Sequence, residues 1–307
     1  MNKTIYFITG PTCIGKSKFA IDFSKIINGE IINADSMQIY KELKIISARP
    51  SSSDIKNVPH HLYGYIMGNE RYNVEKWCND ASVKINLLHN NNLTPIFVGG
   101  TGLYIDTLIN GITAIPTIPE IVKAESNELY DKIGSEKFFN LVNELDNEAT
   151  KNISQNDKQR LKRIWEVFHY TNQKFSSWKK NNNKKFLNSI NCKIILFLPD
   201  KEKNYQRVNK RVLTMINKGA IEEIQKLLKL NYKQELPIMR AHGVPEISSY
   251  LKKNITLEEC IKKIQLVTRH YVKRQNTWWR SSKLQIFKKI NEFPDEFDAK
   301  SANLAKF

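Results

Sequence analysis

A glycine-rich loop near the start of the chain constrains its fold more than any other feature. The segment GPTCIGKS (10–17) matches the pattern G-x-x-x-x-G-K-[ST]. It follows the apolar run 3–9 and precedes helical apolar spacing over 16–27. In a strand–loop–helix unit of this kind, backbone N–H groups point at one anion and the helix N-terminus adds a favourable dipole. The sequence therefore predicts that a phosphate chain binds at residues 10–17.

Two side chains of this loop have predictable roles. Lys16 supplies a positive charge to the terminal phosphates, and Ser17 offers a hydroxyl to Mg²⁺, the cofactor that we expect. The residues expected to contact the anion are Gly10, Pro11, Thr12, Cys13, Ile14, Gly15, Lys16 and Ser17. Because most proteins with this loop hydrolyse a nucleotide or transfer a phosphoryl group, the loop alone favours a kinase or an NTPase.

Strands and helices alternate in the rest of the chain, which indicates a parallel sheet wrapped by helices. The apolar runs 30–34, 94–98 and 193–198 predict three further buried strands, and residues 74–89 predict a helix between the first two of these. Between residues 112 and 190 no strand pattern is present, and the polar segment 181–185 predicts a loop. Helical spacing continues over 120–133, 135–145, 157–170, 203–218, 220–230 and 257–280.

These patterns predict an α/β fold with a P-loop NTPase-like parallel sheet flanked by helices. Residues 1–112 and 190–307 are expected to form the catalytic core with its C-terminal helices, and residues 113–189 a helical insertion. Trp278 and Trp279 are expected to belong to the buried core rather than to a site.

A second group of polar residues is expected at the carboxyl edge of the sheet, beside the phosphate loop. Asp35 follows the strand at 30–34; its position is compatible with a Mg²⁺ ligand, a general base or a helix N-cap. A glycine turn at VGGTGLY (98–104) brings Thr101 to the same edge. His60 and His61 are expected in a loop and, without a third ligand at metal spacing, do not predict zinc.

Charge distribution indicates a polyanionic partner. The chain has a net charge of +17; residues 1–112 carry 11 Lys and Arg against 9 Asp and Glu, whereas the remainder carries 37 against 22. This concentration in the later part favours contact with a nucleic acid or another polyanion. Four scattered cysteines, no signal peptide and no apolar run of membrane-spanning length predict a cytoplasmic protein without disulfides or a membrane contact.

Seven segments, in order and spacing, resemble the successive signatures of the tRNA dimethylallyltransferase family. They are GPTCIGKS (10–17), DSMQIYKEL (35–43), PHHL (59–62), VGGTGLYIDTLINGI (98–112), NDKQRLKRIWEVF (156–168), RVNKRVLTMINKGAIEEIQKLL (207–228) and RHYVKRQNTWWR (269–280). A kinase is expected to share only the first of them. Two stretches depart from the family pattern: IISARP (45–50) replaces Ile-Gly-Thr-Ala-Lys-Pro, and AHGVPE (241–246) replaces Ile-Gly-Tyr-(Lys/Arg)-Glu. The second departure leaves open whether residues 242–245 contact tRNA.

The resemblance implies a reaction between dimethylallyl diphosphate and the exocyclic amine of the adenosine 3′ of the anticodon. Lys16, the loop amides and Mg²⁺ then stabilise the departing diphosphate, and Asp35 accepts the amine proton. Thr101 matches a family position near the substrate and is counted with the catalytic residues. Arg207 and Arg211 are both candidates for the diphosphate, and the sequence does not choose between them.

The resemblance also implies a tRNA interface that grips the anticodon stem-loop while the adenine is extruded. The implied tRNA contacts are Asp35, Ser36, Met37, Gln38, Thr101, Gln159, Arg160, Leu161, Lys162, Arg163, Arg269, Lys273 and Arg274. Three rivals remain: a small-molecule or nucleoside kinase, a prenyltransferase acting on free adenine nucleotides, and a non-catalytic tRNA-binding protein. The basic helical insertion argues against the second, and Asp35 beside an intact phosphate loop argues against the third. A monomer is expected.

Overall fold

The chain divides into two compact units. The computed structural model describes residues 3–181, 183–188 and 190–297. The first unit, called here the core unit, comprises Met1–Ile109 and Phe186–Phe307, and the second, the helical unit, comprises Asn110–Lys185. The division at 110 and 185 lies three and four residues before the limits expected from the sequence.

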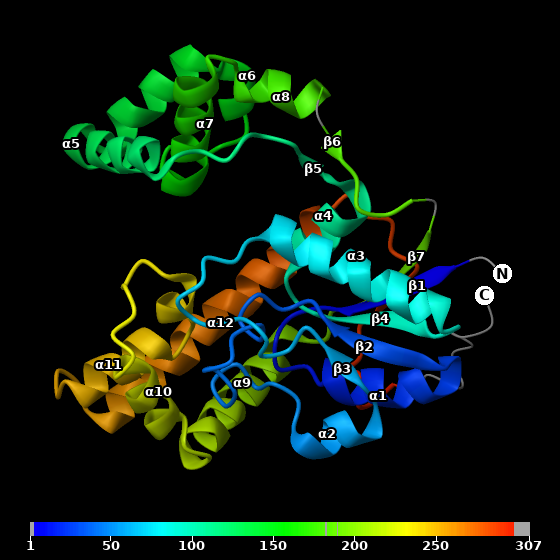
Figure 1. Ribbon diagram of the computed structural model, residues 1–307. Coiled ribbons are helices and arrows are strands. Elements are labelled where there is room, and N and C mark those ends of the chain that lie inside the picture. Colours follow the sequence, from blue (N-terminus) through cyan, green and yellow to red (C-terminus); the bar gives the residue numbers. More distant parts are fainter. Residues whose placement is uncertain (1–2, 182, 189, 298–307) are drawn as a thin grey trace. The chain divides into compact units, whose positions relative to one another are not determined.

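A six-stranded sheet organises the core unit (Figure 1). Its strands, in spatial order, are β3 (His60–His61), β2 (Gly29–Asn33), β4 (Thr94–Gly99), β1 (Thr4–Thr9), β7 (Asn191–Phe197) and β8 (Lys288–Ile290). All neighbouring strands pair in parallel, as the alternation of strands and helices predicts. The expectation of a loop at His60 and His61 is wrong, because these residues pair with Ile31 and Ile32 of β2. β8 has no counterpart among the expected strands.

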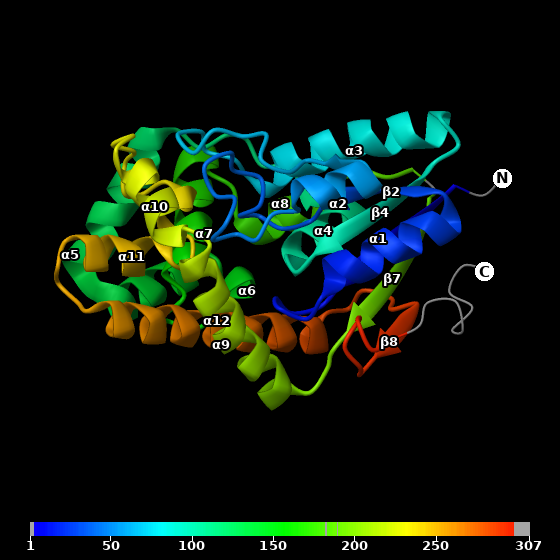
Figure 2. The same ribbon diagram turned by 90° about the horizontal axis from the view of Figure 1, so that it is seen from below.

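Alternating side chains of the strands cover the two faces of the sheet. From β1, Ile5 and Phe7 pack into a cluster with α3 (Val74–Asn90) and α4 (Gly102–Asn110). Tyr6 and Ile8 face the opposite side and pack with α1 (Lys16–Ile27), the helix that follows the phosphate loop. Figures 1 and 2 show α1 and α3 on opposite sides of the strands. Burial of both faces explains why the central strands read as unbroken apolar runs.

The later helices of the core unit form a third apolar cluster. It joins α9 (Lys201–Asn217), α10 (Ala220–Leu228), α11 (Val244–Leu251) and α12 (Leu257–Ser281) to apolar residues of the segment 39–46. The short elements α2 (Ser52–Asn57) and η1 (Pro237–Arg240) lie in the connections. A capping box at Thr256 and Glu259 begins α12, and near its end Trp279 is buried, which confirms the expectation of a core residue.

The helical unit contains α5 (Glu120–Leu145), α6 (Asn147–Thr150), α7 (Lys158–Thr171) and α8 (Phe175–Asn181). Gly134, at φ 80°, kinks α5 at the point that separates the two helices expected there. The expectation that residues 112–190 lack strands is wrong. β5 (Ile112–Thr113) pairs antiparallel with β6 (Asn183–Lys184), so two residues of the expected loop at 181–185 form a strand, and Asn181 ends α8; residue 182 lies outside the described residues. Two residues per strand are too few to show a period in the sequence.

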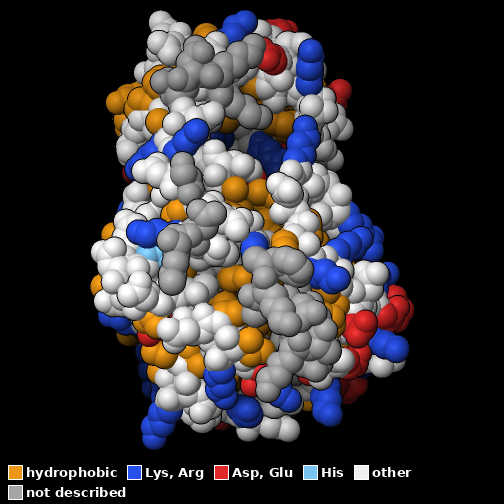
Figure 3. All heavy atoms as spheres, turned by 90° about the vertical axis from the view of Figure 1, so that its right-hand side faces the viewer, with side chains coloured by type: hydrophobic (Ala, Val, Ile, Leu, Met, Phe, Trp, Pro, Cys, Tyr) orange, Lys and Arg blue, Asp and Glu red, His pale blue; other side chains and the backbone are white. Residues whose placement is uncertain are grey.

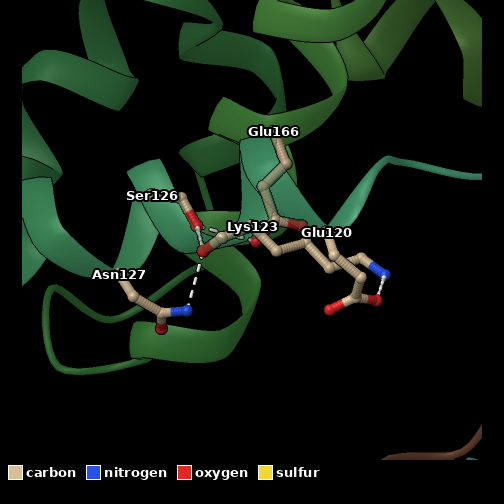
Figure 4. A network of polar contacts seen from close by, with 5 residues as sticks. All are labelled: Glu120, Lys123, Ser126, Asn127 and Glu166. Atoms are coloured by element: carbon tan, nitrogen blue, oxygen red, sulfur yellow. Dashed lines mark hydrogen bonds and ion pairs between the residues drawn. The ribbon is translucent and has the colours of Figure 1, made fainter.

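Polar contacts also join α5 to α7. Ser126 of α5 donates a hydrogen bond to Glu166 of α7 at 2.8 Å, and both residues are buried (Figure 4). On α5 itself, Lys123 pairs with Glu120, and its carbonyl oxygen accepts hydrogen bonds from Ser126 and Asn127. Glu166 thus has a buried partner within the helical unit, where an unpaired carboxylate would be costly.

Basic side chains are distributed over much of the surface seen in Figure 3 rather than gathered at one point. None of the helices in the described part of the chain combines the length and the apolarity that crossing a bilayer requires.

Candidate active site

The phosphate loop leaves the end of β1 and forms a cavity of about 120 Å³. Gly10 adopts φ 140°, and a Cβ there would lie 2.2 Å from the carbonyl oxygen of Phe197, so the turn requires glycine. The remaining loop residues lead into α1, whose first residues, Lys16, Ser17 and Lys18, also line the cavity. The cavity is lined by Thr12, Cys13, Ile14, Gly15, Lys16, Ser17, Lys18, Asp35, Gln38, Ala48, Val98, Gly99, Gly100, Arg211 and Gln275.

Lys16 is held by the loop itself. Its ammonium group donates hydrogen bonds to the carbonyl oxygens of Pro11 at 2.6 Å and Gly10 at 3.1 Å. Burial lowers the pKa of Lys16 from 10.5 to about 8; the charge of Asp35 opposes this shift, and the charge of Arg211 adds to it. Lys16 is therefore placed at the cavity with its positive charge only partly compensated, which suits an anionic ligand.

Asp35 lies across this cavity at the end of β2. Its Oδ1 accepts hydrogen bonds from the backbone amides of Met37 at 2.8 Å and Gln38 at 3.4 Å. These bonds stabilise a turn, and no helix begins in residues 36–51, so the N-cap alternative is wrong. The hydroxyl of Thr101 accepts a hydrogen bond from the amide of Ser36 at 3.2 Å. Asp35 and Thr101 are thus brought together, and one carboxylate oxygen of Asp35 has no part in the turn.

A larger, mostly apolar cavity of about 210 Å³ adjoins the phosphate cavity. Its lining residues are Thr12, Cys13, Asp35, Ser36, Met37, Leu43, Ile46, Ser47, Val208, Arg211, Val212, Met215, Arg240, Ala241, His242, Ile264, Thr268 and Tyr271. Four of them, Thr12, Cys13, Asp35 and Arg211, also line the phosphate cavity. A ligand with an anionic end and a short apolar end therefore finds both environments side by side.

One wall of the apolar cavity is fixed by Glu223 of α10. Its carboxylate accepts hydrogen bonds from the consecutive backbone amides of Lys44, Ile45 and Ile46 at 2.7–2.9 Å. Ile46 and its neighbours Leu43 and Ser47 face the cavity. This set of charge-assisted bonds holds the segment that departs from the family pattern at 45–50.

The two candidate arginines have different surroundings. Arg211 lines both cavities and donates a hydrogen bond to the Cys13 sulfur at 3.4 Å. Arg207, one turn earlier on α9, pairs with Asp295 at 2.8 Å and Glu296 at 3.2 Å. Because a diphosphate at Arg207 would have to compete with the carboxylates of Asp295 and Glu296, the geometry favours Arg211 as the contact for a diphosphate.

His242 and Tyr271 form an aromatic corner of the apolar cavity. Their ring centroids lie 5.1 Å apart in an edge-to-face arrangement. Burial and the charge of Arg274 lower the pKa of His242, while burial and the charge of Asp35 raise that of Tyr271, so both shifts favour the neutral ring. The departure from the family pattern at 241–246 thus places a histidine in the cavity wall, and Gly243 and Pro245 at the start of α11.

The comparisons with known proteins address the family directly. The family model described as IPP transferase matches residues 38–282, and the one described as isopentenyl transferase matches residues 3–63. The chain belongs to the IPP transferase family. It is 40% identical to a tRNA dimethylallyltransferase of Ehrlichia canis, over 94% of this chain and 98% of that protein, and 40% identical to one of Pelagibacter ubique, over 90% and 88%.

Solved structures of the IPP transferase family share the fold. A tRNA isopentenylpyrophosphate transferase from Bacillus halodurans is 27% identical with a TM-score of 0.69, covering 98% of this chain and 93% of that one. A eukaryotic dimethylallyltransferase acting on tRNA gives a TM-score of 0.75 at 26% identity, covering 90% of this chain and 69% of that one. The P-loop NTPase-like fold expected from the sequence is thereby confirmed.

The segment 159–163, which the IPP transferase resemblance assigns to tRNA, lies on α7 of the helical unit. Gln159 and Arg160 are exposed, and Arg160 pairs with Asp157 at 3.3 Å. Lys162 and Arg163 are half-buried, and burial lowers the pKa of Arg163. Leu161 is fully buried in the core of the helical unit, so its assignment as a tRNA contact is wrong for the side chain: the residue occupies the apolar face of an amphipathic helix.

The second tRNA stripe assigned through the IPP transferase resemblance lies on α12. Lys273 and Arg274 are exposed, and Arg274 lies 3.3 Å from His242 Nε2. Arg269 is half-buried and donates a hydrogen bond to Asn209 at 2.8 Å. Lys273 and Arg274 therefore present their charge to solvent, whereas Arg269 also has a structural partner on α9.

The sequence did not reveal several residues of this site. Arg240, Thr268, Tyr271 and Gln275 line a cavity but were not among the predicted site residues, and the role of His242 was left open. For Tyr271 and Gln275 a signal existed, because both lie in the segment 269–280 and share a helix with the basic stripe. Apart from Met37, the apolar wall had none: Leu43, Ile46, Val208, Val212, Met215 and Ile264 read as ordinary core positions.

Proposed function

We propose that this protein transfers a dimethylallyl group from dimethylallyl diphosphate to the exocyclic amine of the adenosine 3′ of the anticodon in tRNA. The observation that carries the proposal is the junction of the two cavities. The phosphate cavity, with Lys16 and Arg211, suits a diphosphate, and the apolar cavity suits a five-carbon chain. Asp35 lines both cavities, which is where the proposal puts the reacting carbon.

In the proposed reaction the allylic C–O bond breaks while a bond forms between that carbon and the adenine nitrogen. Negative charge grows on the departing diphosphate, and the loop amides, Lys16 and Arg211 stabilise it. The amine loses its proton to Asp35, a role worth on the order of 10²–10⁴ in rate. The apolar wall excludes water, which would otherwise capture the prenyl group.

Mg²⁺ is part of the proposal. Ser17 at the start of α1 and Asp35 both line the phosphate cavity, and Ser17 is the residue proposed to offer a ligand. Within the described residues no cluster of three His, Cys, Asp or Glu side chains could hold a metal ion. This donor set fits Mg²⁺, which is commonly bound by one or two protein groups together with substrate phosphates and water. When bound, the ion neutralises charge on the diphosphate.

The adenosine is proposed to enter extruded from the anticodon loop, with Ser36, Met37, Gln38 and Thr101 beside it. Exposed basic residues of α7 and α12 are proposed to hold the RNA backbone. The reaction is proposed to take place in the cytoplasm, with the protein acting as a monomer.

A labelled-transfer assay tests the proposal. The purified protein, Mg²⁺ and dimethylallyl diphosphate labelled in the prenyl group are incubated with unmodified tRNA or with free AMP. Label is expected in the tRNA alone, with release of diphosphate. Transfer to AMP alone would indicate a prenyltransferase of free nucleotides, and release of ADP from ATP with no transfer to tRNA would indicate a kinase.

A further inference from the structure

Gln275 of α12 connects the two loops on which the proposed reaction depends. The residue is 5% exposed, and both ends of its side-chain amide are engaged. Its Oε1 accepts a hydrogen bond from the amide of Thr12 in the phosphate loop at 2.8 Å. Its Nε2 donates one to the carbonyl oxygen of Gly100 in the acceptor-side loop at 2.9 Å.

These contacts replace backbone pairing where the sheet ends. β1 and β4 pair in parallel as far as Thr9 and Gly99. The Thr12 amide and the Gly100 carbonyl come after the last paired residues and so lie outside the ladder. A primary amide carries one donor end and one acceptor end, as a peptide group does. The Gln275 side chain therefore adds one further hydrogen-bonded connection between the phosphate loop (10–17) and the acceptor-side loop that contains Gly100 and Thr101.

The fit is specific for glutamine opposite glycine. A Cβ at position 100 would lie 2.1 Å from Gln275 Nε2, so only glycine leaves room for the amide. A glutamate would keep the acceptor for Thr12 but lose the donor for Gly100. An asparagine is one methylene shorter and cannot span both contacts at these distances.

The acceptor-side loop extends this connection to Asp35. The residue after Gly100, Thr101, donates its amide to the carbonyl oxygen of Ala34 at 3.3 Å, and its hydroxyl accepts the amide of Ser36. Ala34 and Ser36 flank Asp35. The position of Gly100 thus sets the position of Asp35, while the contact with Thr12 ties it to the diphosphate side.

We propose that Gln275 is a positioning residue that fixes the distance between the phosphate loop and Asp35. The inference rests on the proposed function for its effect on turnover, but the hydrogen bonds themselves can be tested without it. Because the reacting atoms must be aligned closely, loss of this connection acts on the chemical step more than on the binding of either substrate.

The kinetic test compares Gln275→Ala and Gln275→Glu with the wild-type protein. Gln275→Ala is expected to lower kcat roughly 100-fold while KM for donor and tRNA stays within about threefold. Gln275→Glu is expected to lower kcat and also raise KM for the donor, because its charge lies at the phosphate cavity. Gln265→Ala is the matched control: Gln265 lies on the same helix and donates to the carbonyl oxygen of Asn209 at 3.3 Å. Its kcat is expected to match that of the wild type.

A second measurement separates positioning from loss of folding and from failure of the proposed function. Hydrogen exchange of the Thr12 amide is expected to be slow in the wild type and in Gln275→Glu, and fast in Gln275→Ala, with unchanged Tm. A kcat within about twofold of wild type in Gln275→Ala would overturn the inference, as would Thr12 protection equal in all variants. A wild type that transfers no prenyl group would refute the proposed function, while Thr12 exchange would still decide whether the connection exists.

Discussion

The core unit and the helical unit use charged residues in opposite ways. In the core unit, Lys16, Asp35 and Arg211 converge on two adjoining cavities, where burial changes the pKa of Lys16. In the helical unit, Arg160 and Lys158 lie at the surface and pair with acidic neighbours. The difference teaches that residues proposed to act on bonds are gathered and partly desolvated, whereas basic residues that pair at the surface, such as Arg160, stay largely solvated. Changes at the cavities should therefore alter donor affinity and rate, and changes to the exposed basic residues of α7 should alter salt-dependent tRNA affinity.

The largest expected effect is that of Asp35→Asn, which keeps the shape of the turn but removes the base. We expect kcat to fall by about 10²–10⁴ while tRNA affinity stays nearly unchanged. Single-turnover kinetics and filter binding measure the two quantities. Asp22→Asn, an exposed aspartate on α1, is the control and should leave both unchanged. Equal losses of rate and of affinity in Asp35→Asn would remove the distinction between the units.

The two arginines of α9 sharpen the comparison within the core unit. Arg211→Gln removes a charged donor from both cavities, and we expect donor affinity to fall by about 10–100-fold, the equivalent of 1.5–3 kcal/mol for a hydrogen bond to a charged group. Arg207→Gln removes a partner of Asp295 and should change donor affinity much less. Isothermal titration with dimethylallyl diphosphate compares the variants. A larger loss in Arg207→Gln would reassign the diphosphate contact.

Lys16 gives the core unit a pH dependence. Because burial lowers its pKa to about 8 in the free protein, the ammonium form that attracts a diphosphate is depleted above that pH. Donor affinity is expected to be constant below pH 8 and to weaken by about tenfold for each further pH unit. Titration of the donor without RNA, in buffers of different ionisation enthalpy, should show a proton taken up on binding at pH 9. Binding that stays unchanged to pH 10 would contradict this assignment.

The smallest expected effect is that of removing charge from α7. In Arg160→Gln with Arg163→Gln, the slope of log affinity for tRNA against log salt should flatten by roughly 0.7 for each lost phosphate contact. At saturating tRNA, kcat should remain that of the wild type. Lys132→Gln with Lys137→Gln, which removes two charges from exposed lysines of α5, serves as the control for net charge. An unchanged slope in the double variant would show that residues 159–163 make no contact with tRNA phosphates.

The same contrast explains what the sequence could and could not predict. The phosphate loop is local, so its eight consecutive residues predicted the cavity, the strand before it and the helix after it. Long amphipathic helices such as α7 and α12 were also predicted, because their period repeats over several turns. β3, β5 and β6 are too short to show a period and form only through pairing with distant partners.

The candidate site was predicted where a side chain follows a strand and missed where it arrives from a distant helix. Asp35 and Thr101 follow β2 and β4, and parallel topology alone brings them together. Tyr271 and Gln275 reach the same place from α12, more than a hundred residues away in sequence. Leu161 shows the converse error, since a residue within a functional segment can belong to the core. Only the packing shows whether a residue within a functional segment lies at the site or in the core.

The hydrogen bonds that Lys16 makes to Gly10 and Pro11 have a consequence for how the site fills. The ammonium group is coordinated by two carbonyl oxygens of its own loop, so the loop itself fixes the position of this charge. An arriving diphosphate then exchanges with these oxygens instead of ordering a disordered side chain. Association should accordingly be limited by that exchange and by desolvation, and product release by the return of the lysine to its internal partners.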